Sequence, residues 1–191
     1  MVKQHLLQVS YTCFLLFLLS GCAVANTFGP YMGKVIDAET EKPIEGAVVF
    51  MKCGSLTSNV AGSQYHYIDA KEVLTDSKGE FYIELRINTL RPGHFRERPK
   101  FVIFKPGFGS YPGYPGSSVD ITIKDARSFF PENQYVTIKL PKLETKEERL
   151  INLDKTDIHH EIPHEKRTNL FKLVNEESAA TGLTPYPLPY K

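Results

Sequence analysis

The sequence predicts an all-β fold, a seven-stranded antiparallel β-sandwich over residues 30–141. Short segments in this region either alternate apolar and polar residues or run apolar over four or five positions. Clusters of Gly, Pro, Asp and Ser separate these segments, as turns do. Helical periodicity is missing from the same region. We expect a signal peptide before the sandwich and a charged, partly helical tail after it, over residues 142–191.

Residues 1–21 are predicted to form a signal peptide. Lys3 supplies the one firm positive charge, and the apolar run that follows is densest over residues 14–19. Gln8, Ser10 and Thr12 interrupt this run, which therefore falls short of the roughly 20 apolar residues that a spanning helix needs. A positive start, a short apolar core and small residues at its end are typical of a secretory signal.

The end of this signal is more specific. Leu19-Ser20-Gly21-Cys22 resembles the lipobox of bacterial lipoproteins. The resemblance implies that diacylglycerol alkylates the Cys22 thiol, that the chain is cut before Cys22, and that the new amino group is acylated. Two or three acyl chains anchor a protein stably, whereas one chain is marginal. Residues 22–29 would form a lipidated linker. The alternative is an ordinary secretory signal with a chance cysteine.

The same resemblance predicts the location of the protein. Ala23 stands where lipoproteins retained in the inner membrane of many Gram-negative bacteria have aspartate. We therefore expect a membrane-anchored lipoprotein of the bacterial envelope, in the outer membrane and facing the periplasm.

Charge and cysteine content narrow the possible functions. Cleavage before Cys22 leaves 22 basic and 22 acidic side chains. A net charge near zero argues against a nucleic-acid partner, which would require a basic surplus. Cys53 would then be the one unmodified cysteine, so no intramolecular disulfide can form. We expect Cys53 to be a small buried apolar residue, the alternative being a reactive or intermolecular thiol.

Seven segments are expected to be strands. In EFYIELRI, the side chains of Phe81, Ile83 and Leu85 alternate with polar ones, which indicates one buried and one wet face. The continuous runs AVVFM and FVIF are typical of central strands covered on both sides. The expected strands are YMGKVID (31–37), AVVFM (47–51), KEVLT (71–75), EFYIELRI (80–87), FVIF (101–104), VDITI (119–123) and YVTIKL (135–140).

The tightest predicted turn is Asp76-Ser77-Lys78-Gly79, between two of these strands. Asp76 can accept hydrogen bonds from the backbone that follows it, and Gly79 can take the positive φ that closes a short loop. The segment is therefore expected to be a β-hairpin.

The tail changes character after Pro141. Leu170, Leu173 and Val174 have helical spacing, and Pro163 suits the first turn of a helix. Gly182 is placed to end that helix. The helix either packs on the sandwich, which we favour, or serves as a docking arm.

Two stretches, GKVIDAETEKPIEGAVVF (33–50) and LTDSKGEFYI (74–83), closely resemble the carboxypeptidase regulatory-like domain. The matching positions are Gly33, Val35, Asp37, Pro43, Gly46, Ala47, Val49, Thr75, Asp76, Gly79, Phe81 and the turn 105–108. The resemblance implies a transthyretin-like (prealbumin-like) seven-stranded sandwich without catalytic residues, for stabilising, adhesive or partner-binding work. The insertion 54–70 departs from the family and is expected to be either a loop over the sandwich edge or an extra hairpin.

The loop YPGYPGSS carries the residues proposed for ligand binding. Tyr111 and Tyr114 stand on a Gly/Pro scaffold and, if exposed, could stack on sugar rings. Tyr65 and Tyr67 of the insertion could extend such a platform. The alternative is that the loop tyrosines cap the end of the sandwich.

Two charged motifs allow weaker hypotheses. HHEIPHE gathers His159, His160, Glu161, His164 and Glu165. These could hold zinc or nickel, but Pro163 breaks the helix that would align them, and a solvated linker is the alternative. RPGHFRERPK gathers Arg91, Arg96, Arg98 and Lys100 against Glu97. It could contact anionic lipid, the alternative being a solvated connecting loop.

No catalytic motif stands out. The sequence lacks a Gly-x-Ser-x-Gly elbow, a phosphate loop and a His-Glu-x-x-His helix. We expect a non-enzymatic lipid-anchored envelope protein, without cofactor or metal, whose sandwich serves protein–protein interaction or structural support. A carbohydrate-binding module that uses the loop tyrosines is the rival, and a metal carrier centred on His160 and His164 is a third hypothesis.

Overall fold

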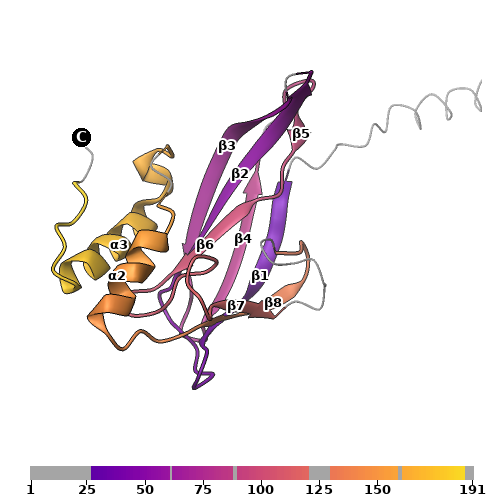
Figure 1. Ribbon diagram of the computed structural model, residues 1–191. Coiled ribbons are helices and arrows are strands. Elements are labelled where there is room, and N and C mark those ends of the chain that lie inside the picture. The colour runs from indigo at the N-terminus through magenta and orange to yellow at the C-terminus, as the bar shows by residue number, and fades with distance from the viewer. Residues whose placement is uncertain (1–26, 61, 88–89, 121–129, 159–160, 188–191) are drawn as a thin grey trace, which may run out of the picture.

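The computed structural model describes residues 27–187, apart from residues 61, 88–89, 121–129 and 159–160 (Figure 1). The predicted signal peptide and Cys22 lie outside the described residues. The described chain is mostly β-strand in two sheets, with helices at its C-terminal end. The predicted all-β architecture with a helical tail is confirmed at this level.

All seven predicted segments overlap observed strands. The strands are β1 (Thr27–Asp37), β2 (Val48–Asn59), β3 (Gly62–Leu74), β4 (Glu80–Arg86), β5 (Phe95–Arg96), β6 (Lys100–Phe104), β7 (Ser118–Asp120) and β8 (Tyr135–Leu140). One sheet has the order β4-β1-β8-β7. In the other, β2 pairs with β3 on one side and with β6 and β5 in succession on the other. Since β1 starts at Thr27, the β-domain begins three residues before the predicted boundary.

The expectation of a wholly antiparallel sandwich is wrong at one pair. β1 and β8 run parallel, in register from Met32 opposite Tyr135 to Asp37 opposite Leu140. The crossover between them contains most of the domain, and parallel pairing requires such a long connection. Alternation along a strand specifies its faces and not the direction of its neighbour, so the sequence pattern could not reveal this pair. The described residues form eight strands and not the expected seven. The additional strand is β5, whose two residues are too few to show an alternation in the sequence.

The insertion 54–70 is neither a separate loop nor an added hairpin. It lengthens β2 and β3 into one continuous antiparallel hairpin that pairs from Val48–Leu74 to Asn59–Gly62. The register shifts once, between Cys53 and Gly54. Figure 1 shows this hairpin reaching beyond the start of β1, with β5 at its side.

The predicted turn after β3 is present, but the prediction that it closes a β-hairpin is wrong, because β3 and β4 lie in different sheets and the turn carries the chain from one sheet to the other. Gly79 has φ +73, and its N–H donates to the Asp76 carbonyl oxygen at 2.8 Å. The Asp76 carboxylate accepts from the N–H groups of Lys78 and Glu80. These bonds satisfy the turn backbone and set β4 in register beside β1.

The main core lies between the two sheets. Its largest buried members come from β1, β2, β4, β6 and β8: Phe28, Tyr31, Val35, Val49, Met51, Ile83, Phe101, Ile103, Val136, Ile138 and Leu140. Cys53 is fully buried among them, as expected. Burial raises the pKa of its thiol well above the ordinary value, so Cys53 is an unreactive packing residue.

The tail packs on the sandwich. Its elements are α2 (Lys146–Lys155), the 3-10 helix η1 (His164–Lys166) and α3 (Thr168–Ala180). Leu170 and Val174 of α3 join Phe50, Val102 and Phe104 in a second core on the outer face of the β2–β3–β6 sheet. Figure 1 shows the helices beside this sheet. The docking-arm alternative is therefore wrong for the described part of the tail.

Candidate functional site

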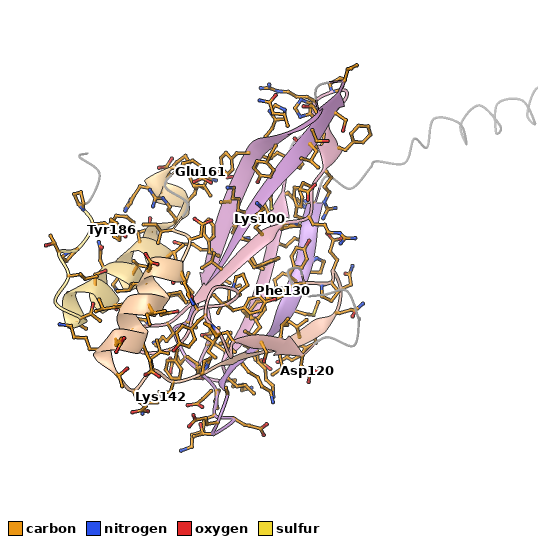
Figure 2. The ribbon with its side chains drawn as sticks, in the orientation of Figure 1. Lys100, Asp120, Phe130, Lys142, Glu161 and Tyr186 are labelled. Carbon is orange, nitrogen blue, oxygen red and sulfur yellow. The ribbon has the colours of Figure 1, made fainter. Side chains whose placement is uncertain are left out.

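The loop tyrosines do not form an exposed platform. Tyr111 is only 5% exposed and its ring stacks on Phe130, with 5.7 Å between ring centroids. Phe130 is labelled in Figure 2 within the sandwich. The half-buried ring of Tyr114 lies against Gly109, where an added Cβ would come 2.5 Å from the Tyr114 Cδ1 atom. The structure thus buries Tyr111, which was expected to be exposed for stacking on sugar rings, and leaves Tyr114 half-buried at the end of the sandwich.

The buried Tyr111 also lines a cleft of about 440 Å³ between the β6 side of the sheet and the end of α2. Two hydrogen bonds hold Ser110 in its wall: the Ser110 N–H donates to the Asn152 side chain at 2.7 Å, and the Ser110 and Thr156 hydroxyls share a bond of 3.1 Å. The Thr156 hydroxyl donates in turn to the Asn152 carbonyl oxygen. These buried contacts fix the loop to α2. The cleft is therefore a by-product of the sheet–helix joint.

The residues of HHEIPHE that the structure describes make packing contacts. Glu161 forms an ion pair with Lys52 of β2, and Figure 2 shows Glu161 on the helical side facing that sheet. His164 packs edge-on against Phe171, with 5.1 Å between ring centroids. Among the described residues, no three His, Cys, Asp or Glu side chains are arranged to hold a metal ion. His159 and His160 lie outside them.

A cleft that the sequence did not predict lies along the far half of the β2–β3 hairpin. His66 of β3 and His94, just before β5, have ring centroids 4.7 Å apart. His94 Nδ1 shares a hydrogen bond with the buried Ser55 hydroxyl at 2.9 Å, and His66 Nε2 shares one with Thr57, also at 2.9 Å. Together with Arg91 and neighbouring tyrosines, these residues line a cleft of about 480 Å³.

The two tyrosines of this cleft are Tyr65 and Tyr67. Burial, followed by nearby acidic or ionisable groups, raises the pKa of each hydroxyl to about 12. Both therefore remain protonated donors at neutral pH. The Tyr65 ring crosses the strand at Gly54, where an added Cβ would lie 2.3 Å from the Tyr65 Cζ atom. Only a glycine at position 54 leaves room for this ring, which lies on the strand face that also carries Lys52.

The chemistry of this cleft favours binding. The Ser55–His94 bond resembles a nucleophile and its base, but an active pair also needs a group that orients the imidazole. Within the described ranges, neither histidine ring is hydrogen-bonded to a carboxylate. The two imidazoles, Arg91 and the Ser55 hydroxyl instead make a polar cleft suited to holding a polar ligand.

The basic segment 86–100 runs past this cleft and is partly structural. Arg96 forms an ion pair with Glu132, and its guanidinium lies 4.2 Å above the centre of the Phe28 ring. Tyr31 donates to the same Glu132 carboxylate at 2.8 Å. Arg96 thereby fixes β5 against the start of β1. By contrast, Arg91 is exposed and makes no side-chain ion pair within the described chain.

The outer face of the β4–β1–β8 sheet carries a row of large side chains. Met32 pairs with Tyr82 on one side and with Tyr135 on the other, so the three lie side by side on one face. Tyr82 and Tyr135 are 56% and 53% exposed. Their hydroxyls donate to Glu84 and Glu80. The described helices pack on the other sheet and leave this face uncovered.

Sequence reasoning missed both the histidine pair and this row. His66 and His94 are 28 positions apart in the sequence, and β5, which brings His94 to β2, is too short to leave a pattern. The row could have been found in part, since Tyr82 alternates with the buried Phe81 and Ile83 and must face outward.

Comparison of the chain with family models, with curated proteins and with solved structures finds no match. Within the described ranges, no helix has the length and apolar content needed to cross a bilayer.

Proposed function

We propose that this chain is a non-enzymatic lipoprotein of the bacterial envelope, held by Cys22 in the outer membrane, whose β-domain faces the periplasm and binds a protein partner. We further propose that the domain is of the carboxypeptidase regulatory-like type. Its two sheets and its Asp76–Gly79 turn support that assignment.

The exposed row on the β4–β1–β8 sheet is the observation that carries the proposal of a protein partner. One outer face of the sandwich is covered by α3, whereas the other presents Tyr82, Met32 and Tyr135 together. Tyrosine and methionine are enriched where proteins bind one another, because they bury large areas at little entropic cost. The flanking carboxylates that hold both hydroxyls fix the rings in place.

Photo-crosslinking in cells tests this proposal. A photoreactive phenylalanine analogue at position 82 or 135 is expected to give one specific adduct, and the same analogue at Lys172 is not. Lys172 is the matched control because its side chain is 71% exposed on α3, which packs on the other sheet. Absence of any adduct specific to positions 82 and 135 would contradict the proposal.

Substitution of the same residues measures their contribution. Tyr82→Ala and Tyr135→Ala are each expected to weaken capture of the crosslinked partner roughly tenfold or more, as centrally placed tyrosines do. Lys172→Ala should leave capture unchanged. Equal capture by all three variants would remove the row from the interface.

A carbohydrate-binding function is the second candidate, and the His66/His94 cleft now favours it over the Tyr111 loop. Tyr67 lines that cleft and stays a protonated donor. Binding to isolated peptidoglycan is expected to fall in Tyr67→Ala and to persist in Tyr114→Ala. Binding that depends on Tyr114 and not on Tyr67 would exclude the cleft.

A further inference from the structure

We propose that one end of the molecule docks on an anionic phospholipid surface. This hairpin end consists of the described residues of the β2–β3 hairpin tip, 56–60 and 62–64, and the neighbouring segment 90–96. The inference rests on the proposed lipid anchor and adds which surface of the domain meets the membrane.

The position of the anchor along the chain sets the geometry. Four residues separate Cys22 from Thr27, where β1 begins. The five steps from Cys22 to Thr27 span at most about 18 Å when the chain is fully extended. Phe28 lies under Arg96, and Arg96 pairs with Ser55 of β2, so the start of β1 lies level with Ser55. Acyl chains on Cys22 therefore hold the domain by the end from which the hairpin projects.

The hairpin reaches about as far as this tether. From Ser55 to the end of β2 at Asn59 the strand advances four residues, and the turn adds to this, for roughly 15 Å in all. Figure 1 shows the hairpin tip beyond the start of β1, with the helices set back along the sandwich. A tether of this length brings the tip to the headgroup layer.

The hairpin end carries apolar side chains suited to an interface. The Val60 side chain projects fully into solvent, and Phe95 is 67% exposed. Phe95 pairs with Leu56, so both apolar side chains belong to one end of one sheet. Aromatic and aliphatic side chains that protrude from a polar surface gain free energy by entering the acyl boundary of a bilayer.

The charge of this end complements a negative surface. Residues 55–68 contain no Asp, Glu, Lys or Arg, and the segment 90–96 holds Arg91 and Arg96 and no acidic side chain. Arg91 is exposed, whereas Arg96 is paired with Glu132. The mature chain is neutral, so the rest of it carries a net charge of −2. Attraction at the hairpin end and repulsion elsewhere favour one orientation on anionic lipid. The lipid anchor and the basic apolar surface lie at the same end of the molecule. This coincidence favours a lipid surface over a protein partner, which could bind at either end.

The test measures the depth of the hairpin tip in vesicles that hold the mature lipidated protein. Val60→Cys carries a nitroxide label, and Leu183→Cys carries the control label, because Leu183 is 47% exposed beyond α3. Cys53 is buried and stays unlabelled. With phosphatidylglycerol present, the label at position 60 should lose access to a soluble nickel chelate and gain access to oxygen. The label at position 183 should stay in water.

Charge variants separate docking from simple anchoring. Arg91→Gln is expected to lower the ratio of docked to free hairpin about fivefold, the effect of one basic side chain near an anionic surface. Lys172→Gln is the matched control and should leave the ratio unchanged. A label at position 60 that stays in water on phosphatidylglycerol vesicles would overturn the proposal and leave the hairpin end to a protein partner. Intact mass reports acylation separately, so failure of the anchor and failure of the docking are distinct results.

Discussion

Glu177 shows how one buried residue joins the tail to the β-domain. Its carboxylate is fully buried and accepts from the Arg149 Nε atom at 2.7 Å and from the backbone N–H of Gly107 at 3.1 Å. Burial of a carboxylate is costly unless a cation and hydrogen bonds compensate it. This residue therefore links α3 to α2 and to the loop after β6 at once.

Removal of the cation should leave that carboxylate uncompensated. Arg149→Ala is expected to lower the free energy of unfolding by about 2–3 kcal/mol, less than a wholly buried pair because the Arg149 side chain is 27% exposed. Urea unfolding measures the change. Arg86→Ala is the control, since its side chain is 87% exposed and 3.9 Å from Glu84, and should cost under about 0.5 kcal/mol. Similar losses in both variants would contradict this account of Glu177.

The glycine of the turn between β3 and β4 makes a second prediction at this scale. Gly79→Ala should cost more than about 2 kcal/mol, because its φ is +73 and the added Cβ would meet the Val35 carbonyl oxygen at 2.4 Å. Gly93→Ala is the matched control: its φ is +77 but nothing lies within 4 Å, so only the backbone cost of about 1 kcal/mol applies. Thermal unfolding measures both variants. An equal loss of stability in Gly79→Ala and Gly93→Ala would contradict the prediction, because it would mean that the Cβ at position 79 meets no clash.

At the scale of elements, the strands and α3 could be predicted and α2 could not. Alternation in EFYIELRI and apolar spacing in α3 each reflect one buried face. The 10-residue α2 buries only Asn152, so it has no apolar stripe to detect. Its one signal is the pair Thr145 and Glu148, which form a capping box. The alternation of apolar and polar residues also does not predict whether neighbouring strands run parallel or antiparallel, as the parallel β1–β8 pair shows.

Packing of α3 on the sheet makes a prediction about the tail. Leu170→Ala should lower the free energy of unfolding by about 2–5 kcal/mol, because Leu170 is fully buried against β2 and β6. Leu183→Ala, at an exposed leucine, should change it by less than about 0.5 kcal/mol. A single unfolding transition is expected for both. A separate early transition in Leu170→Ala would show that the tail unfolds independently.

The capping box predicts a pH dependence for α2. Hydrogen bonds from the Thr145 backbone and hydroxyl hold the pKa of Glu148 below its ordinary value of 4.5. A carboxylate with a lowered pKa stabilises the folded state above its ordinary pKa and loses that contribution as the pH falls. Carboxyl NMR titration should show the lowered pKa in the wild type and a partial rise in Thr145→Ala, which loses the hydroxyl donor and keeps the backbone N–H. An unchanged titration in the variant would contradict the capping role.

Across the whole molecule, the two outer faces of the sandwich differ. Helices cover one, and the other presents the Tyr82–Met32–Tyr135 row. The sequence could predict two faces for each strand but not which face the tail would cover. The His66/His94 cleft was likewise beyond prediction, because it depends on the short pairing of β5 with β2. Tyr111 was misplaced since an aromatic residue in a Gly/Pro loop can point inward as easily as outward.

The central claim is that Cys22 anchors this domain to the envelope membrane. Intact mass and membrane fractionation of the wild type beside Cys22→Ser test it most directly. We expect a wild-type protein that begins at acylated Cys22 and sediments with membranes, and a variant that is arrested in processing or released. A wild-type protein that is soluble and cut at another residue would contradict the claim.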